Sequence, residues 1–309
     1  MKTISKLFLF STTVLATVGC GSQEPTGGKK NEPVDVVVIS GQSNAVGCTN
    51  QTFIKNTLGT DKYYEYMRGY PGIPIAFDSW TKDSWTEPGK VYYYSQNTSK
   101  NNDFVKVMLG QGNSQATFGP EIGIAEKLSE TRANKLFLIK YACGASNLKD
   151  DWADRNSEMY PRLINYVKYQ MNNLKNKGYT PTIKAFCWMQ GEGDSYPNYY
   201  DKYLENTRKF VSNLREDLKD LAGGENTLPF IDAGINNSKE WEYWKEVNEA
   251  KAQFATESEK NIYIDTIGAG LHTDREENGD GSAHYDSDSE VKLGNLFAEA
   301  FEPFLTKLD

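Results

Sequence analysis

Histidine is scarce in this 309-residue chain, which contains only His272 and His284. The scarcity limits the chemistry that the chain can perform, because a serine nucleophile is inert unless a base takes its proton. Lysine and arginine (34) are outnumbered by aspartate and glutamate (42), and the formal charge is −8. This balance argues against nucleic acid as a partner, since binding to nucleic acid depends on Lys and Arg at the phosphates.

Cysteine is also rare, and its four positions contain no C-x-x-C pair that would indicate a metal site. Cys48, Cys143 and Cys187 each lie beside an apolar segment, so we expect buried thiols. A disulfide between Cys48 and Cys143 is the alternative.

The N-terminal segment has the pattern of an export signal. Two lysines form a basic start, an apolar stretch follows over residues 7–18, and Gly19 and Cys20 end it. The stretch is too short to span a bilayer as a mature helix. With the flexible residues 21–33 after it, the segment resembles a bacterial lipoprotein signal over residues 1–20, in which Cys20 carries lipid and the following residues form a tether. A plain signal peptide cleaved nearby is the alternative, and both predict export.

Beyond residue 33, apolar strand-like segments alternate with amphipathic helix-like ones. The predicted strands are 34–40, 135–139, 183–189, 229–235 and 262–267. The predicted helices are 119–128, 161–178, 204–221, 240–257 and 289–305. This alternation indicates one α/β domain over residues 34–309, with a parallel sheet and helices on both of its faces.

The stretch from Cys48 to Phe118 departs from the alternation. It has no clean periodicity and is rich in Gly, Tyr, Trp and Asn. A structureless stretch of this length between a strand and its helix is unusual and is often functional. We expect it to cover the carboxyl edge of the sheet, and Trp80 and Trp85 are candidate substrate contacts within it.

Four short segments follow predicted strands on the same edge of the sheet, where open α/β sheets place their reactive groups. They are Gly41-Gln42-Ser43-Asn44, Cys143-Gly144-Ala145-Ser146, Trp188-Met189-Gln190-Gly191-Glu192-Gly193-Asp194 and Asp280-Gly281-Ser282-Ala283-His284-Tyr285. The small residues of the first two would let backbone N–H groups approach a reacting oxygen. Ser43 is therefore a candidate nucleophile and His284 a candidate base.

The order of these segments resembles the SGNH hydrolase superfamily, and within it the carbohydrate esterase family 6 and sialate O-acetylesterase group. GQSN at residues 41–44 and W-x-Q-G-E-x-D at residues 188–194 carry the resemblance. It implies a flavodoxin-like, three-layer αβα fold with a five-stranded parallel sheet and a long insertion after the first strand. It also implies that Ser43 is the nucleophile and His284 the general base.

The resemblance implies an oxyanion hole formed by the backbone N–H groups of Ser43 and Gly144 with the Gln190 side chain. The superfamily usually has an aspartate three residues before the histidine, a position that Gly281 occupies here. Asp280 lies one residue further back, so the acid that orients the histidine is either Asp280, which is slightly favoured, or Glu192.

The implied function is that of an exported serine esterase, which removes O-acetyl groups from a carbohydrate through an acetyl-serine intermediate and needs no cofactor or metal. Membrane contact is expected only through lipid at Cys20. A carbohydrate-binding protein that has lost catalysis and an esterase with a non-sugar substrate are the alternatives. His272 is expected to be a surface or packing histidine, and Asp194 a solvated loop carboxylate or a charge at a helix N-terminus.

Overall fold

The computed structural model describes residues 31–83, 92–273 and 283–307. The segment predicted to be an export signal lies outside the described residues, as do Cys20, Trp85 and Asp280. Among the described helices, none is long and apolar enough to cross a membrane.

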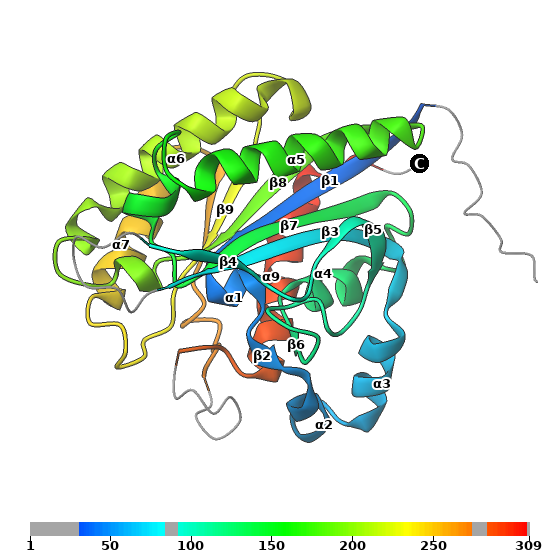
Figure 1. The fold of residues 1–309 in the computed structure, drawn as a ribbon, viewed down its shortest axis with the longest axis horizontal. Helices are drawn as coiled ribbons and strands as arrows, with labels where there is room; N and C mark the ends of the chain where they lie inside the picture. The colour runs from blue at the N-terminus through cyan, green and yellow to red at the C-terminus, as the bar shows by residue number, and fades with distance from the viewer. Residues whose placement is uncertain (1–30, 84–91, 274–282, 308–309) are drawn as a thin grey trace, which may run out of the picture.

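An eight-stranded sheet forms the centre of the molecule, in the order β10-β9-β8-β1-β7-β3-β4, with β5 also paired to β3 (Figure 1). The strands are β1 (Glu32–Gly41), β3 (Tyr70–Lys82), β4 (Tyr94–Gln96), β5 (Asn101–Val107), β7 (Leu136–Gly144), β8 (Tyr179–Met189), β9 (Phe230–Ala233) and β10 (Asn261–Ile264). The strands from β10 to β3 run parallel, whereas β4 and β5 are antiparallel to β3. The short strands β2 (Thr49–Asn50) and β6 (Thr117–Phe118) form a separate pair.

The five predicted strands are confirmed as β1, β7, β8, β9 and β10. Numbered along the chain, they lie in the order 2-1-3-4-5, which is the flavodoxin order. β7 is buried along its whole length, as expected for a strand covered on both faces by helices. β1 begins at Glu32, so the last two residues of the predicted tether belong to the sheet.

The predicted number of strands was wrong, because the insertion adds three strands to the sheet. β3 pairs with β7 in parallel from Ile75↔Leu138 to Thr81↔Gly144. The insertion therefore widens the sheet through much of its length. Its predicted role as a cover of the carboxyl edge stays a prediction. The first half of β3 contains Pro71 and Pro74, which argue against a strand in sequence reasoning and lie where the pairing with β5 is irregular.

Helices cover both faces of the sheet (Figure 1). One face is covered by α5 (Met159–Asn176) and α6 (Tyr203–Leu218), and the other by α4 (Glu121–Leu128) and α9 (Ser287–Phe301). The remaining described α-helices are α1 (Ser43–Val46), α2 (Ile54–Thr57), α3 (Thr60–Arg68) and α7 (Trp244–Ala255).

Two glycines let α4 and α9 pack closely against each other. A Cβ on Gly123 would lie 1.9 Å from the Val291 carbonyl oxygen, and one on Gly294 would lie 2.0 Å from the Pro120 oxygen. Any larger residue at either position would separate the two helices. This close contact fixes the position of α9, which begins three residues after His284.

Candidate active site

Ser43 lies in the turn that follows the central strand β1. Gly41 has φ +139°, and a Cβ there would lie 1.9 Å from the Met189 carbonyl oxygen, so the position requires glycine. The Gln42 N–H donates to the same carbonyl oxygen at 2.9 Å. Ser43 then starts the single turn α1, partly buried, at the boundary between β1 and β8 where the strand order reverses. Such a switch point is where open α/β sheets bind their ligands.

The buried Asn44 side chain joins three segments that are far apart in the sequence. Its Nδ2 donates to Glu192 Oε1 at 2.8 Å, and its Oδ1 accepts from the Tyr285 N–H at 3.3 Å. The Thr49 hydroxyl donates to the Tyr285 carbonyl oxygen at 2.7 Å. The residue next to His284 is therefore held from two sides by the chain that follows Ser43. Asn44 belongs to the GQSN motif, but the sequence alone predicted no role for it.

The Gln190 side chain is fixed by neighbours on every side. Its Nε2 donates to Asp194 Oδ2 at 2.7 Å and to Gln42 Oε1 at 3.2 Å, while Tyr203 donates to its Oε1 at 3.2 Å. Both amide hydrogens thus have acceptors. The role of Gln190 in an oxyanion hole stays a prediction, and it requires the longer bond to Gln42 to be exchanged for the substrate oxygen.

Gly144 ends β7 beside Thr81 of β3, and hydrogen bonds of Ser146 hold the turn after it. Ala145 is exposed with φ +57°, in the left-handed region that few residues other than glycine adopt. The Ser146 hydroxyl donates to the Cys143 carbonyl oxygen at 2.7 Å and accepts from the Trp152 indole N–H at 2.8 Å. The Gly144 backbone is therefore presented by a fixed turn at the same edge as Ser43.

The three described positions Cys48, Cys143 and Cys187 are free thiols. Cys143 and Cys187 are buried, as expected, and Cys48 is partly buried. The alternative of a disulfide between Cys48 and Cys143 is therefore wrong.

Asp194 is fully buried, so it is not a solvated loop carboxylate; it contacts the first residues of the helical turn Leu148–Trp152, as the alternative of a helix N-terminal charge predicts. The carboxylate accepts from the backbone N–H groups of Leu148 at 2.6 Å and Lys149 at 3.3 Å, as well as from Gln190. Burial raises the pKa of Asp194 to about 7, although these donors act in the opposite direction. Asp194 thereby links the Gly144 turn to the Gln190 turn.

Replacing Asp194 with alanine is expected to lower the free energy of unfolding by about 3 kcal/mol, because three donors, two of them buried, would lose this acceptor. Urea unfolding measures this change. Asp201→Ala removes an exposed carboxylate of the same region and should be nearly neutral. Equal stability of the two variants would show that the buried carboxylate does not hold the two turns together.

Glu192 is also fully buried, close to the His284 segment. Its Oε1 accepts from Asn44, and its Oε2 has no donor among the described residues. Burial raises the pKa of Glu192, while the Asn44 hydrogen bond and the charges of Lys251 and His284 oppose the shift. Sequence reasoning did not find Lys251, which is buried in α7 and forms an ion pair with the buried Asp232 of β9.

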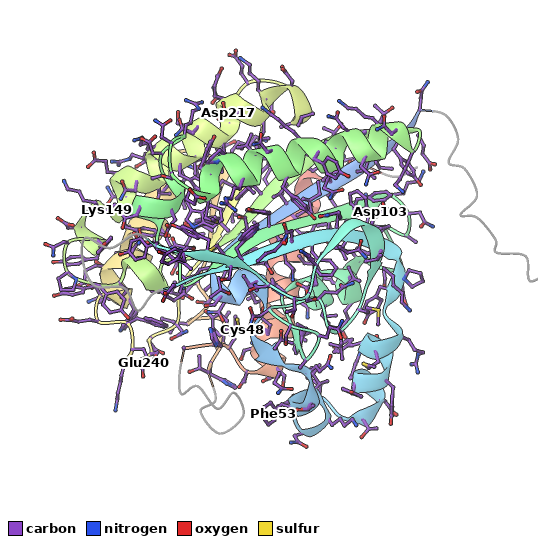
Figure 2. All side chains as sticks on the ribbon, in the orientation of Figure 1. Cys48, Phe53, Asp103, Lys149, Asp217 and Glu240 are labelled. Atoms are coloured by element: carbon purple, nitrogen blue, oxygen red, sulfur yellow. The ribbon has the colours of Figure 1, made fainter. Side chains whose placement is uncertain are left out.

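His284 itself is partly buried and described, whereas Asp280 lies outside the described residues. The structure thus brings together Ser43, Gly144, Gln190, Glu192 and the His284 segment at one edge of the sheet. Figure 2 shows Cys48, Lys149 and Glu240 at this end of the molecule and Asp103 at the other.

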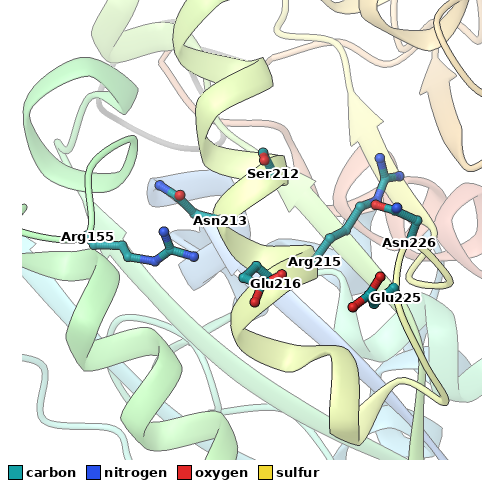
Figure 3. A pocket seen from close by; sticks show the side chains of 7 residues that line it. All are labelled: Arg155, Ser212, Asn213, Arg215, Glu216, Glu225 and Asn226. Carbon is teal, nitrogen blue, oxygen red and sulfur yellow. The ribbon is translucent and has the colours of Figure 1, made fainter.

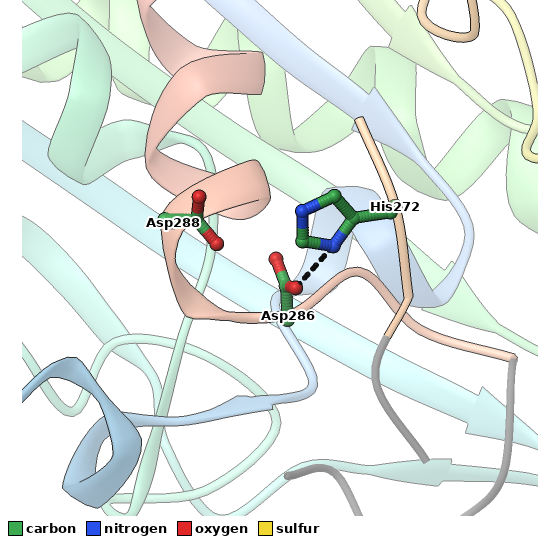
Figure 4. A group of neighbouring side chains, drawn as sticks. All are labelled: His272, Asp286 and Asp288. Atoms are coloured by element: carbon green, nitrogen blue, oxygen red, sulfur yellow. Dashed lines mark ion pairs between the residues drawn. The ribbon is translucent and has the colours of Figure 1, made fainter. Parts of the chain in front are cut away.

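His272 lies on the surface, as predicted, and its side chain is 61% exposed. Its Nδ1 forms an ion pair with Asp286, whose other oxygen accepts from the Ser289 N–H and caps α9 (Figure 4). Asp288 completes a group whose ligand atoms lie within 4.8 Å of one another. Burial raises the pKa of Asp286 to about 6, and the nearby Asp288 adds to the shift. Among the described residues, this group is the arrangement that could hold a metal ion.

The Trp80 ring lies below the Arg162 guanidinium of α5, which is 4.5 Å from the ring centroid. Trp80 is therefore packed against a helix in this structure, and its contact with substrate stays a prediction. The predicted contact of Trp85 with substrate also stays a prediction, because Trp85 lies outside the described residues.

A surface pocket lies away from these residues, on the second half of α6 (Figure 3). It is lined by Arg155, Ser212, Asn213, Arg215, Glu216, Glu225 and Asn226. Residues 225 and 226 lead into the amino end of β9, opposite the edge that carries Ser43. None of the candidate catalytic residues lines this pocket.

The sheet order and the segments gathered at its carboxyl edge define a flavodoxin-like α/β protein with a candidate catalytic edge. A family model described as carbohydrate esterase, sialic acid-specific acetylesterase matches residues 33–302. The chain belongs to this family of carbohydrate acetylesterases.

Solved structures share the fold. A protein from Arabidopsis thaliana is 21% identical with a TM-score of 0.59, over 89% of this chain and 100% of that one. The protein NanS is 16% identical with a TM-score of 0.60, over 89% of this chain and 98% of that one. No curated protein sequence matches the chain at a significant level.

Proposed function

We propose that this protein is a serine esterase that removes O-acetyl groups from a carbohydrate. The observation that carries the proposal is the double contact of Asn44, which holds the Ser43 turn against both Glu192 and the backbone next to His284. Membership of a family of carbohydrate acetylesterases supports the choice of ester and substrate class.

In the proposed reaction, Ser43 Oγ attacks the acetyl carbonyl carbon while His284 takes the hydroxyl proton. The negative oxygen of the tetrahedral intermediate accepts from the backbone N–H groups of Ser43 and Gly144, with the Gln190 amide as a third donor. The bond to the sugar oxygen then breaks, and His284 returns the proton to that oxygen. Water, deprotonated by His284, then attacks the acetyl carbonyl carbon. The bond to Ser43 Oγ breaks, acetate leaves, and His284 returns the proton to Ser43 Oγ.

The contacts of Glu192 support different roles for the two candidate acids, Glu192 and Asp280. Glu192 Oε1 already accepts from Asn44, so this carboxylate acts on the spacing of Ser43 and His284 through Asn44. We therefore propose that Asp280 orients the imidazole and that Glu192 is a positioning residue.

A panel of esters tests the substrate class against the two alternatives. Acetate release would be measured from acetylated xylan, acetylated pectin, O-acetyl sialosides and p-nitrophenyl acetate. Release from at least one glycan is expected. Turnover of the aryl ester alone would favour a non-sugar substrate, and no turnover of any ester would favour a binding protein.

Chelation with EDTA is expected to leave acetyl-ester turnover unchanged, because the proposed steps use only side chains and backbone N–H groups. EDTA would remove a cation held by the His272–Asp286–Asp288 group, which is where a cation would bind among the described residues. The treatment therefore tests whether such a cation contributes to turnover. Loss of turnover that added zinc or calcium restores would contradict the metal-free scheme.

We also propose that the protein is exported and anchored by lipid at Cys20, on the pattern of its first 33 residues. Expressed with its own signal in a bacterial host, it should be found in the membrane fraction. Cys20→Ser should release it. A mature N-terminus elsewhere, measured by mass spectrometry, would reduce the proposal to simple secretion.

A further inference from the structure

Two loops at the catalytic edge bring four aromatic rings together, which we call the aromatic shelf: Tyr196, Tyr200, Trp241 and Tyr243. Tyr200 and Tyr243 are stacked, with centroids 3.9 Å apart and planes 3° from parallel. The rings of Tyr196 and Trp241 lie 6.4 Å apart at 87° and form a corner. Tyr196 is 41% exposed, so at least one ring of the shelf is available to a ligand.

Hydrogen bonds lock the two loops to each other. The Tyr243 N–H donates to the Ser195 hydroxyl at 2.9 Å, and the Tyr196 hydroxyl donates to the Glu240 carbonyl oxygen at 3.4 Å. Asn248 holds both the N–H and the carbonyl oxygen of Ile235, where the second loop begins. The shelf is thus preorganised, which lowers the entropic cost of binding a ligand.

The shelf lies close to the reacting groups on two sides. Tyr196 is four residues from Glu192, a span of at most about 14 Å, and Glu192 is bonded to the Asn44 that follows Ser43. At the other side, the Tyr285 hydroxyl donates to the Gly234 carbonyl oxygen at 3.2 Å, just before the second loop. The two loops of the shelf are therefore continuous with the segments that hold Ser43 and His284.

We propose that the aromatic shelf binds a neutral pyranose unit of the glycan chain beside the acetylated sugar. The inference rests on the proposed function and specifies its substrate. Aromatic faces pack against the C–H face of a sugar ring, and the tyrosine hydroxyls offer polar contacts at the ring edge. Exposed charges of both signs flank the shelf, with Glu240, Glu242 and Asp201 against Lys239, Lys202 and Lys149. The shelf therefore offers no cluster of positive charge to hold the carboxylate of a sialoside.

The test compares Tyr196→Ala and Trp241→Ala with the wild type on acetylated xylotetraose, acetylated xylose and p-nitrophenyl acetate. KM for the tetrasaccharide should rise about tenfold, equivalent to about 1.4 kcal/mol. Turnover of the two small esters should stay within about twofold, since neither reaches the shelf. Tyr196→Phe should raise KM much less than Tyr196→Ala, because it keeps the ring and loses only the hydroxyl that donates to Glu240. Tyr169→Ala, which removes an exposed tyrosine from α5, is the matched control.

Three results would overturn the inference. They are an unchanged KM for the tetrasaccharide in both alanine variants, an equal loss on all three esters, and a lower wild-type KM for an O-acetyl sialoside than for the tetrasaccharide. Failure of the proposed function has a different signature, which is a wild-type protein that releases acetate from no glycan. In that case, calorimetric titration with unacetylated xylohexaose decides the matter, and equal or absent binding in wild type and Trp241→Ala overturns the shelf.

Discussion

Replacing Ser43 with alanine is expected to lower kcat for acetyl esters by about six orders of magnitude, to the level left by substrate binding and the oxyanion hole. His284→Ala should cause a similar loss. Because nucleophile and base act as one unit, the double variant should be little worse than either single one. Steady-state and single-turnover kinetics on p-nitrophenyl acetate measure the effect.

His272→Ala is the matched control, since it removes the other histidine of the chain, which is exposed and paired with Asp286. It should keep near wild-type turnover. Substantial turnover by Ser43→Ala would refute the assignment of the nucleophile, and a large loss in His272→Ala would instead favour His272 as the base.

Asp280→Asn is expected to lower kcat by about four orders of magnitude, the loss seen when the sole orienting carboxylate of a serine–histidine–aspartate triad is neutralised. Glu192→Gln should cost much less, because a glutamine oxygen at the same place can still accept from Asn44. Both variants would be compared in kcat on one ester, after circular dichroism has shown that they are folded.

A pair of variants on Asn44 separates positioning from proton chemistry. Asn44→Ala removes both of its contacts and should lower kcat, whereas Asn44→Asp keeps the acceptor for the Tyr285 N–H and places a second carboxylate against Glu192.

A loss of about four orders of magnitude in Glu192→Gln, with Asp280→Asn nearly unaffected, would reverse the assignment of the orienting acid.

The strands that were easiest to predict from the sequence, β1 and β7, are largely apolar and buried on both faces. β1 and β7 are near-continuous buried runs, and such runs predict strands of a parallel sheet. β3 escaped because its second half carries polar residues that are buried and paired. Asp78 accepts from Gln96 at 2.9 Å, and Ser79 accepts from Asn97 at 2.9 Å. The hydrophobic periodicity of the sequence does not predict such contacts between polar residues.

The candidate site also has parts that the sequence predicts and parts that only the structure shows. Ser43, Gly144 and His284 could be placed at one edge of the sheet because each follows a strand or lies in a family motif. The buried links between their segments could not, because Asn44 and Asp194 contact residues 148 and 46 positions away. A buried carboxylate and a solvated one look alike in a sequence, and only the fold shows that Asp194 accepts from two backbone N–H groups.

The central claim is that Ser43 carries the acetyl group between the two half-reactions. Rapid quenching of the wild-type protein during turnover of p-nitrophenyl acetate, followed by peptide mass spectrometry, tests it most directly. The account predicts one acetyl group on the peptide that contains Ser43, absent in Ser43→Ala and lost again when the ester is exhausted. An acetyl group on another residue, or full turnover by Ser43→Ala with no acetylated peptide, would contradict it.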